Sequence, residues 1–567
     1  MAPQAPIVYL GATAMLTAFG RGTAANFEAV ASGASGLVTL TDTALSGSPL
    51  MASRVDDALL IDAPQLTRFE RLAATVVIDV LRRSGVGRSR VGLIVSTTKG
   101  NIASLGGSGM PEAGSPVFIA EAAQRMADFC GIETKPISLS NACISGVSAV
   151  IIASRLIRAG IFESMIVVGA DELTRFVVTG FDGFKSLSHS RCRPYDAARD
   201  GLNLGEGSAA LLLTSDAALG EGIVVEGGAI TDDANHISGP SRTGQPLADA
   251  IGLAMSQSGL WPGDVSFVNA HGTATAYNDE MESKAIALAG LAGVPVNSLK
   301  PYFGHTLGAS GAIEIALCAE QLRHGLLLGT PGYEACGVPE PLMVSAAGRR
   351  AALSRCVKTA SGFGGCNAAV VLAAEGVTRP VSLPPSRPLH TARTVEIAHG
   401  EVLVDGSRVF GADGCFADFI RAAFRHLDRP NMKFFKMDNL CKLGYVGAEF
   451  LLDGVGLRPG RTAIVLANRS ASLDSDCRHR DVIAQSDSAS PAVFVYTLPN
   501  VVMGEICIRH KITGENSFFI VHEYDENRIL QYARTMFAQG FHDKAIVGFC
   551  ELLGEDYRLR ISLLETK

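Results

Sequence analysis

The segment 140–146 constrains the fold of this chain more than any other, because two different periodicities meet there. Upstream, residues 135–140 read as a short extended run that contains a proline, and downstream, residues 146–153 are small and apolar on every side, as in a helix buried all round. Cys143 lies at this corner and faces a helix N-terminus, whose free N–H groups favour an anion. We therefore expect a lowered thiol pKa and a nucleophilic Cys143, with a structural cysteine as the alternative.

Two histidines and one glycine-rich turn stand in equally distinctive settings. His271 directly follows the short apolar run 265–268, and His305 follows a glycine just before a small, apolar stretch. The turn is Ser-Gly-Phe-Gly-Gly-Cys-Asn at residues 361–367, after a strand-like run. Either histidine alone could be a satisfied core residue. A metal site is not expected, because no carboxylate or second histidine lies at ligand spacing on one element.

In this order, the four segments resemble the β-ketoacyl-acyl-carrier-protein synthases of the thiolase superfamily, specifically the elongating class with a Cys-His-His site. A fifth signature agrees with them: residues 193–207 carry Arg-Pro-Tyr-Asp, then Arg-Asp-Gly and Gly-Glu-Gly. The resemblance runs from about residue 6 to about residue 375. It implies an α/β thiolase fold, in which two similar layered halves lie at residues 1–215 and 216–375.

The resemblance also implies a role for each central residue. Cys143 would hold an acyl chain as a thioester, while His271 and His305 would stabilise the enolate that forms when a malonyl thioester decarboxylates. The backbone N–H groups of Cys143 and Phe363 would form the oxyanion hole for acyl transfer. Phe363, between glycines, would act as a gate that swings between acyl transfer and condensation.

Four further positions match the family. Lys300 and Glu314 stand where the family has a structural ion pair, and Thr273 and Thr275 stand where family hydroxyls bond the phosphopantetheine arm of an acyl carrier protein. A surface lysine and turn-forming threonines are the alternatives. No metal and no bound cofactor are expected, since the phosphopantetheine arm enters only as the carrier of the substrate.

Other activities fit these residues less well. A non-decarboxylating thiolase needs a second cysteine as base, and Cys366 follows the Gly-Phe-Gly-Gly turn where elongating synthases commonly carry a small polar residue. Initiating synthases and chalcone-type enzymes use Cys-His-Asn, whereas the third position here is His305. The run 85–90 misses a dinucleotide fingerprint at its last position, and the sequence has no Gly-x-Ser-x-Gly elbow around a plausible serine nucleophile.

A C-terminal extension follows the region of resemblance. Residues 376–393 contain four prolines and predict a linker, and residues 394–567 predict a degenerate copy of the first half, because 533–547 parallels 153–167 as helix, glycine, loop and strand. In that register the nucleophile corner becomes residues 496–505, without a cysteine. The extension thus resembles a truncated chain-length-factor-like half domain without catalytic residues, as in aryl-polyene-type pathways. An unrelated α/β appendage is the alternative.

Composition limits the partners and the compartment. A chain of 567 residues needs more than one core, and its net charge of −7 argues against a nucleic-acid partner. Its 12 cysteines lack C-x-x-C and zinc-type spacing, which indicates reduced thiols. The N-terminus lacks the basic region of a signal peptide, and no apolar run reaches the ~18 residues that span a bilayer. We expect a cytoplasmic protein without membrane insertion.

These observations predict a 3-oxoacyl-acyl-carrier-protein synthase, which condenses malonyl-carrier with an acyl group on Cys143 in polyketide or aryl polyene biosynthesis. Ordinary fatty-acid elongation is one alternative, and a non-catalytic scaffold of a polyketide complex is another. An acyl carrier protein is the expected partner. Two assemblies stay open: a homodimer, or an intramolecular pseudo-heterodimer in which the extension takes the partner's place. In the second, residues 488–494 would help to set the depth of the acyl tunnel.

Overall fold

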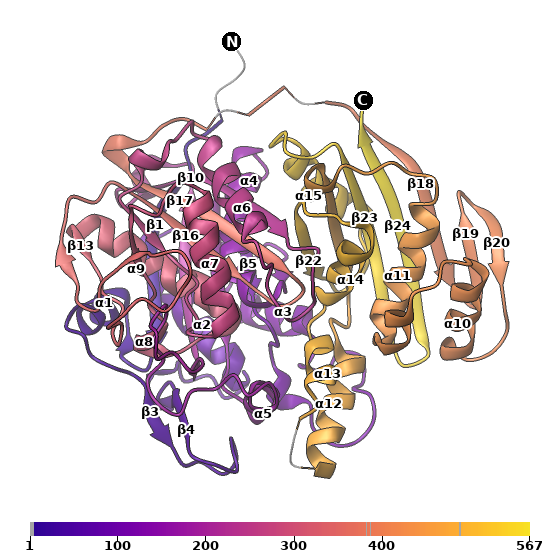
Figure 1. The fold of residues 1–567 in the computed structure, drawn as a ribbon, viewed down its shortest axis with the longest axis horizontal. Helices are drawn as coiled ribbons and strands as arrows, with labels where there is room; N and C mark the ends of the chain where they lie inside the picture. The colour runs from indigo at the N-terminus through magenta and orange to yellow at the C-terminus, as the bar shows by residue number, and fades with distance from the viewer. Residues whose placement is uncertain (1–4, 382, 386, 487–488) are drawn as a thin grey trace.

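The computed structural model describes residues 5–381, 383–385, 387–486 and 489–567, and Figure 1 shows its two parts side by side. The first part holds two α/β halves, coloured from indigo to salmon, and the extension, from orange to yellow, lies beside them. Residues 1–4, 382, 386 and 487–488 lie outside the described residues; 382 and 386 belong to the predicted linker, and Ser488 belongs to the segment predicted to set the tunnel depth.

The first half is built on a sheet with the strand order β6-β5-β7-β9-β1. Its centre is parallel, since β5 pairs in parallel with β6 and β7, while β9 and β1 join in antiparallel register. The bounds are β1 Tyr9–Thr17, β5 Gly92–Ser96, β6 Ile137–Leu139, β7 Ser164–Asp171 and β9 Gly207–Thr214.

Helices cover both faces of this sheet. On one face, α2 (Arg68–Ser84) and α3 (Ile119–Cys130) pack against it; a capping box of Thr67 and Glu70 starts α2. On the other face lies α4 (Ser145–Arg158), in which every residue is buried, as its apolar pattern predicted. Helix α4 therefore belongs to the interior of the molecule and fixes the corner that carries Cys143.

The second half repeats this layering. Its sheet runs in the order β10-β17-β16-β11-β12, and β1 also pairs with β10, which joins the two halves. Helix α9 (Ser310–His324) lies beside α4, and both helices contact both sheets. The strands span β10 Ile223–Asp232, β11 Phe267–Asn269, β12 Pro295–Asn297, β16 Arg355–Ser361 and β17 Cys366–Ala374. The layers are those of a thiolase fold, as predicted.

The close approach of α4 and α9 depends on glycine. A Cβ on Gly146 would lie 2.7 Å from the backbone nitrogen of Ala312, and one on Gly311 would lie 2.4 Å from that of Val147. Neither position tolerates a side chain, because backbone atoms cannot move aside cheaply. The two central helices are therefore locked together at the level of Cys143.

The extension copies the first half strand by strand. In it, β21 pairs in parallel with β22 and β23, and β24 and β18 join in antiparallel register, which gives the order β22-β21-β23-β24-β18. Helices α11 (Asn439–Leu451), α14 (Val501–His510) and α15 (Glu526–Phe537) repeat the places of α2, α3 and α4. The strands span β18 Leu389–Ala398, β21 Thr462–Asn468, β22 Asn516–Ile520, β23 Lys544–Leu553 and β24 Asp556–Thr566.

Two details of the predicted extension were wrong. The corner that corresponds to the nucleophile corner lies between β22 and α15, at residues 521–525, and not at 496–505. The segment 496–505 instead leads into α14, because α12 (Leu473–Ser486) and α13 (Pro491–Phe494) lengthen the connection after β21. The strand β18 begins inside the predicted linker 376–393, since its pairing with β24 starts at Leu389, one residue after the last proline.

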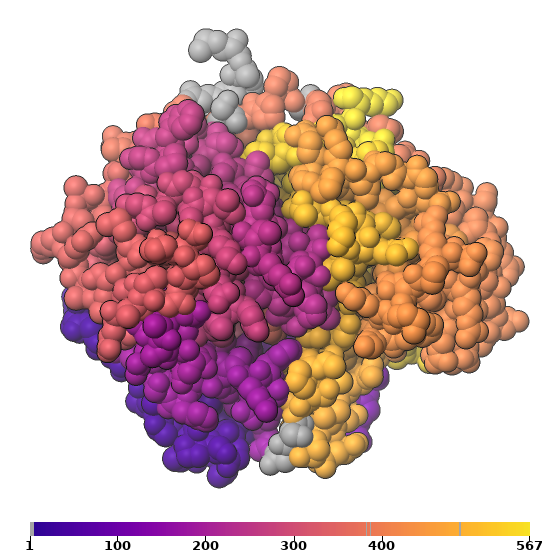
Figure 2. Space-filling view, viewed as in Figure 1, coloured from indigo at the N-terminus to yellow at the C-terminus, as the bar shows by residue number. Residues whose placement is uncertain are grey.

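The two parts share one sheet and one core. Strand β6 pairs in antiparallel register with β22, where Leu139 faces Phe519, so the sheet of the first half and the sheet of the extension become one continuous sheet. A single hydrophobic cluster runs from α4 and α9 through β6 to β22 and α14. Figure 2 shows the orange and yellow surface meeting the magenta surface over the whole height of the molecule. The extension thus pairs with the β6 edge of the first half within the one chain.

Two buried ion pairs cross this junction. Arg155 on α4 lies 2.8 Å from Glu515, with each side chain 1% exposed, and Lys99 lies 2.6 Å from Asp476 on α12, with each 5% exposed. Buried charges need such partners, because an unpaired charge in the interior is costly. The junction is therefore specific in its polar contacts as well as extensive in its apolar ones.

Within the described ranges, no single helix is both long enough and apolar enough to cross a bilayer. Only the pair 491–497 and 501–510 reaches that composition together, and it is bent by 101°.

Candidate active site

One cavity of about 410 Å³ brings the predicted residues together. It lies at the ends of strands from both halves, next to the corner that precedes α4 and the turn that joins β16 to β17. Six predicted residues line it, while Lys300 and Glu314 lie behind its wall in the protein interior. The lining residues that were predicted are Cys143, His271, Thr273, Thr275, His305 and Phe363.

The corner that carries Cys143 is held by a tight set of hydrogen bonds. Ala142 has a positive φ of 47°, and Ser145 accepts a hydrogen bond from the Asn141 N–H at 2.8 Å and donates to the Ala142 carbonyl at 2.6 Å. The Asn141 side chain binds β22 of the extension, where it donates to the Asn516 carbonyl at 2.8 Å. The extension therefore supports the nucleophile corner directly.

The protonation of Cys143 differs from the prediction. The side chain borders the cavity and is only partly exposed, and its surroundings raise the pKa of the thiol to about 12. Desolvation is the main cause, and it outweighs the opposing effect of the Lys300 ammonium group. The expectation of a pKa lowered by the helix N-terminus was therefore wrong for this state. Cys143 is a neutral thiol here, and its proton must leave during the attack.

This protonation state predicts the pH dependence of alkylation. The rate at which iodoacetamide modifies Cys143 should rise about tenfold per pH unit from pH 7 to pH 10, because only the thiolate reacts and the pKa lies above that range. Intact mass and peptide mapping after timed quenching would measure the rate at this residue. A rate that levels off near neutral pH would show that the N-terminus of α4 dominates over desolvation.

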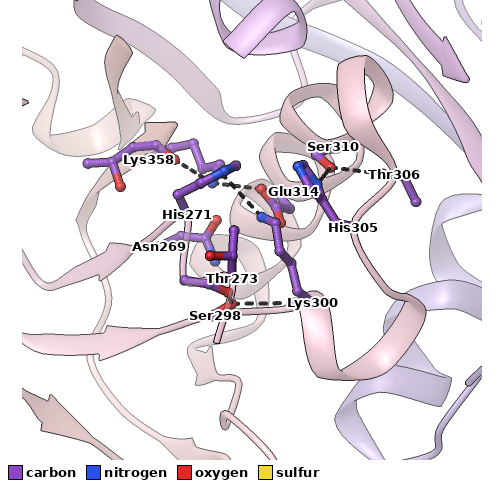
Figure 3. Close-up of polar contacts among 12 residues, drawn as sticks. Asn269, His271, Thr273, Ser298, Lys300, His305, Thr306, Ser310, Glu314 and Lys358 are labelled. Atoms are coloured by element: carbon purple, nitrogen blue, oxygen red, sulfur yellow. Dashed lines mark hydrogen bonds and ion pairs between the residues drawn. The ribbon is translucent and has the colours of Figure 1, made fainter. Parts of the chain in front are cut away.

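His271 and His305 face each other across the cavity, with ring centroids 5.1 Å apart and planes at 84°. The His271 Nδ1 atom lies 3.4 Å from the Lys300 ammonium, and the His305 Nδ1 atom lies 3.0 Å from the Ser310 hydroxyl (Figure 3). An ammonium group can only donate, so His271 Nδ1 accepts, and the neutral ring carries its proton on Nε2. Burial, reinforced by Lys300, holds the pKa of both histidines well below its usual range.

Each histidine is also fixed through its backbone. The His271 N–H donates to Glu282 at 2.7 Å just after β11, and the His305 N–H donates to the Asn203 carbonyl at 2.7 Å. Both rings are therefore preorganised and neutral. Such rings can donate a hydrogen bond to an oxygen that gains negative charge, without first losing a proton.

A buried charge network lies behind the histidines (Figure 3). Glu314 on α9 binds Lys300 at 2.9 Å and Lys358 on β16 at 2.7 Å, and all three side chains are at most 1% exposed. Burial alone would raise the pKa of Glu314, but the two ammonium groups bring it below its usual value. The predicted pair Lys300–Glu314 is present as a contact. Lys358 was missed, although a lysine within a strand-like run signals a buried counter-ion.

The two predicted threonines lie on the loop after His271. Their hydroxyl groups are 2.9 Å apart, and the Thr273 N–H donates to Asp279 at 3.1 Å, which holds the loop against α7 (Ala276–Leu288). Tyr277, 77% exposed, lines the same cavity beyond them. The threonines therefore stand between the histidines and the mouth of the cavity.

Phe363 lies on a turn that packs directly against Cys143. A Cβ on Gly362 would be 3.1 Å from the Cys143 nitrogen, which places the turn beside the predicted oxyanion donors. The Phe363 ring contacts Phe184 and Phe181 at centroid distances of 5.4 and 6.1 Å. Gly364 follows with a φ of 91°, a conformation that favours glycine.

The aromatic cluster beside Phe363 includes one residue of the extension. The ring centroids of Phe494 and Phe181 lie 5.6 Å apart, and a Cβ on Gly180 would lie 2.3 Å from the Phe494 ring. Phe494 belongs to the segment 488–494 that was predicted to affect the tunnel, but Phe181 and Phe184 of the first half were not singled out. Cys366 is buried behind the turn, 3.6 Å from the Asn141 carbonyl.

Comparison with known protein families matches the two halves separately. Residues 53–218 match the family described as "Beta-ketoacyl synthase, N-terminal domain", and residues 222–334 match "Beta-ketoacyl synthase, C-terminal domain". The extension lies outside both matches.

Curated relatives resemble the same region. The chain is 35% identical over 269 residues to a "Tetracenomycin polyketide synthase ketoacyl synthase alpha subunit" from Streptomyces glaucescens, an alignment that covers 44% of this chain and 62% of the relative. It is 32% identical over 252 residues to a "3-oxoacyl-[acyl-carrier-protein] synthase 2" from Rhizobium meliloti, an alignment that covers 41% of this chain and 60% of that relative. The chain thus spans about three fifths of the length of these relatives.

Solved structures also resemble the chain. A ketosynthase in complex with its chain length factor from Xenorhabdus doucetiae is similar with a TM-score of 0.58 and 26% identity, covering 65% of this chain and 98% of that one. A "Keto synthase-Chain length factor" protein is similar with a TM-score of 0.78 and 14% identity, covering 99% of this chain and 78% of that one. The second likeness is one of fold, and it includes the extension.

Proposed function

Because residues 53–334 of this chain belong to the beta-ketoacyl synthase family, we propose that it is a 3-oxoacyl-acyl-carrier-protein synthase that performs a decarboxylative Claisen condensation. The observation that carries the proposal is the convergence of Cys143, His271 and His305 on one cavity, with both imidazoles neutral. This arrangement supplies a nucleophile and two hydrogen-bond donors, the groups that the two steps of the reaction need.

In the first step, the Cys143 sulfur attacks the thioester carbonyl of an acyl carrier protein. The thiol is protonated at rest and both imidazoles carry their proton on Nε2, so the thiol proton leaves through water in the cavity during the attack. The oxyanion is held by the backbone N–H groups of Cys143 and Phe363, as in the family. The carbonyl then re-forms, the phosphopantetheine sulfur leaves and takes up the proton, and Cys143 keeps the acyl group.

In the second step, malonyl-carrier loses carbon dioxide, and the electron pair of the broken bond forms an enolate. The Nε2 protons of His271 and His305 stabilise the enolate oxygen. The carbanion carbon attacks the Cys143 thioester, a carbon–carbon bond forms, and the Cys143 sulfur leaves and is reprotonated. The product is a 3-oxoacyl-carrier, longer by two carbons. Lys300, paired with Glu314, keeps His271 in the tautomer that donates.

The proposed substrates are carried and not bound as cofactors. Thr273 and Thr275, at the loop between the histidines and the mouth, would bind the phosphopantetheine arm of an acyl carrier protein. No other cofactor and no metal take part in the proposed reaction. We propose an acyl carrier protein as the partner. The similarity of this chain to a polyketide ketoacyl synthase and to a 3-oxoacyl-[acyl-carrier-protein] synthase supports this.

Polyketide assembly is the favoured context, because the likeness in fold to a "Keto synthase-Chain length factor" protein includes the extension, and Phe494 of the extension packs in the aromatic cluster beside the active site. An aryl polyene product is one form of this proposal, supported by the predicted resemblance of the extension. Ordinary fatty-acid elongation is the second candidate, favoured by the likeness to a 3-oxoacyl-carrier synthase 2. A purely structural role in a complex is disfavoured by the intact buried network around Glu314.

The test is a reconstituted condensation. Purified protein would be incubated with acyl-carrier proteins of graded chain length and with malonyl-carrier, and the carrier products would be identified by intact mass. The proposal predicts an acyl adduct on the synthase, release of carbon dioxide and a 3-oxoacyl product. The absence of both the adduct and the product at every chain length would refute the proposal.

The position of Phe494 leads to a prediction about the preferred length of the acyl chain. Phe494→Ala should accept acyl chains longer by about two to four carbon atoms, because loss of the ring leaves a void of that size beside Phe181 and Gly180. Competition among acyl-carriers, read by intact mass, measures the preference. Val493→Ala, on the same short helix, is the matched control and should keep the wild-type preference. Equal preferences in all three proteins would contradict the role of Phe494.

A further inference from the structure

The extension holds the turn that carries Phe363 through one amide side chain. Asn500, which precedes α14, donates from Nδ2 to the Phe363 carbonyl at 2.8 Å and is 1% exposed. The same nitrogen lies 3.7 Å from the Cys366 sulfur, at the other end of the turn. A buried amide that binds the backbone of the gate is therefore supplied by the part of the chain that has no catalytic residues of its own.

The contact between α14 and the turn is close as well as polar. A Cβ on Gly504 would lie 2.5 Å from the Gly364 carbonyl oxygen, and a Cβ on Gly364 would lie 2.5 Å from Asn500 Nδ2. Two glycines are thus required where the first turn of α14 meets the turn of the synthase. A movement of the Phe363 turn must change its contacts with α14.

The segment next to the turn is tethered to the extension too. The Gly364 N–H donates to the Ile237 carbonyl at 2.7 Å, which joins the turn to residues 232–237. Asp232 in that segment accepts from Asn516 Nδ2 at 2.5 Å, and its N–H donates to the Thr513 carbonyl at 3.2 Å. The extension therefore contacts both of the segments that border the active site beside Phe363.

The Asn500 amide has one free side. Its Oδ1 atom is buried and has no hydrogen-bond partner among the residues that the structure describes. If the peptide between Phe363 and Gly364 rotated, its carbonyl would leave Nδ2, and its N–H would leave the Ile237 carbonyl and could approach Oδ1. The Asn500 amide could then donate to the peptide in one orientation and accept from it in the other. Such an amide favours two discrete orientations of the peptide over the intermediate ones.

We propose that Asn500 is a positioning residue for Phe363, through which the extension times the change from acyl transfer to condensation. The inference rests on the proposed function. In the described state Asn500 holds the Phe363 ring against Phe181 and Phe184, beside Cys143. The turn leaves this position to admit an acyl group and returns to it for condensation, and the hydrogen bond from Asn500 favours the return.

The experiment separates the two half-reactions in Asn500→Ala and Asn500→Asp. Acyl transfer is measured as the rate of adduct formation on Cys143 from an acyl-carrier, by quenched intact mass. Condensation is measured as the single-turnover rate of the preformed acyl-enzyme with malonyl-carrier. We expect acyl transfer at the wild-type rate or faster and condensation about tenfold slower, as the loss of one hydrogen bond to a buried amide implies. Asp should act more strongly than Ala, because its carboxylate repels the Phe363 carbonyl.

A matched control removes buried atoms from the same helix without touching the turn. Val502 packs against Gly444 inside the extension, so Val502→Ala should lower the melting temperature but leave the ratio of the two rates unchanged. If both Asn500 variants change the two rates in parallel, as loss of folded protein would, Asn500 is only structural and the inference fails. If the wild type forms no adduct and no product, the proposed function fails, and the inference with it.

Discussion

Replacing Cys143 with alanine is expected to abolish the acyl adduct and to lower condensation by about 10⁴-fold or more, because no other group in the cavity can hold the acyl chain as a thioester. The histidines and the Glu314 network do not depend on the thiol, so decarboxylation of malonyl-carrier should persist in Cys143→Ala. Intact mass for the adduct and carbon dioxide release for decarboxylation distinguish the two effects.

Cys366→Ala is the control for this substitution. Cys366 is buried and lies behind the Phe363 turn, so its loss removes a thiol near the site without removing the nucleophile. It should keep the adduct and most of the condensation rate. An adduct that survives in Cys143→Ala and disappears in Cys366→Ala would reverse the assignment and would revive the thiolase alternative.

Removing one partner of the Lys99–Asp476 pair is expected to have the largest effect on stability. Asp476→Ala should lower the free energy of unfolding by about 3–5 kcal/mol, because it leaves a buried ammonium group without its partner. Burial lowers the pKa of Lys99 and raises that of Asp476 to about 6, which shows that the pair pays a desolvation cost even when intact. Urea unfolding, followed by fluorescence and by circular dichroism, measures the change.

The double variant Lys99→Met/Asp476→Leu tests the cause. If the loss in Asp476→Ala comes from an uncompensated charge, an apolar pair of similar volume should restore most of the stability. If the loss comes from the hydrogen bond that Asp476 accepts from Ser472, just before α12, the double variant should be as unstable as the single one. The Lys99 ammonium also contacts the Thr497 carbonyl, so Lys99→Met alone removes a donor from two buried acceptors and should cost at least as much as Asp476→Ala.

The layered fold and the central residues could be predicted because they follow from short, local patterns. The buried helix after Cys143 is apolar on every side in the sequence, and α4 is buried on every side in the structure. His271, His305 and Phe363 each lie in segments with glycines and threonines at fixed positions, and these segments meet at one cavity. Their catalytic roles stay predictions until the half-reactions are measured.

The remaining features depend on contacts between distant segments. Nothing near Asn500 in the sequence indicates that its amide reaches Phe363, 137 residues away. The register of the extension was wrong because β22 is short and partly polar, so the more apolar segment 496–505 fitted the strand pattern better. The predicted direction of the Cys143 pKa shift was wrong because a helix N-terminus can be recognised in a sequence, whereas the desolvation that outweighs its effect cannot.

The pairing of β6 with β22 inside one polypeptide has a consequence for mass action. A partner supplied by a second gene must be made in equal amounts, and its complex falls apart on dilution when the concentration drops below the dissociation constant. Here the two halves of the sheet are joined through residues 378–388, so the local concentration of one around the other does not depend on expression level or dilution. The edge strand β6 is also covered by β22, so a second chain cannot pair with that edge in this fold.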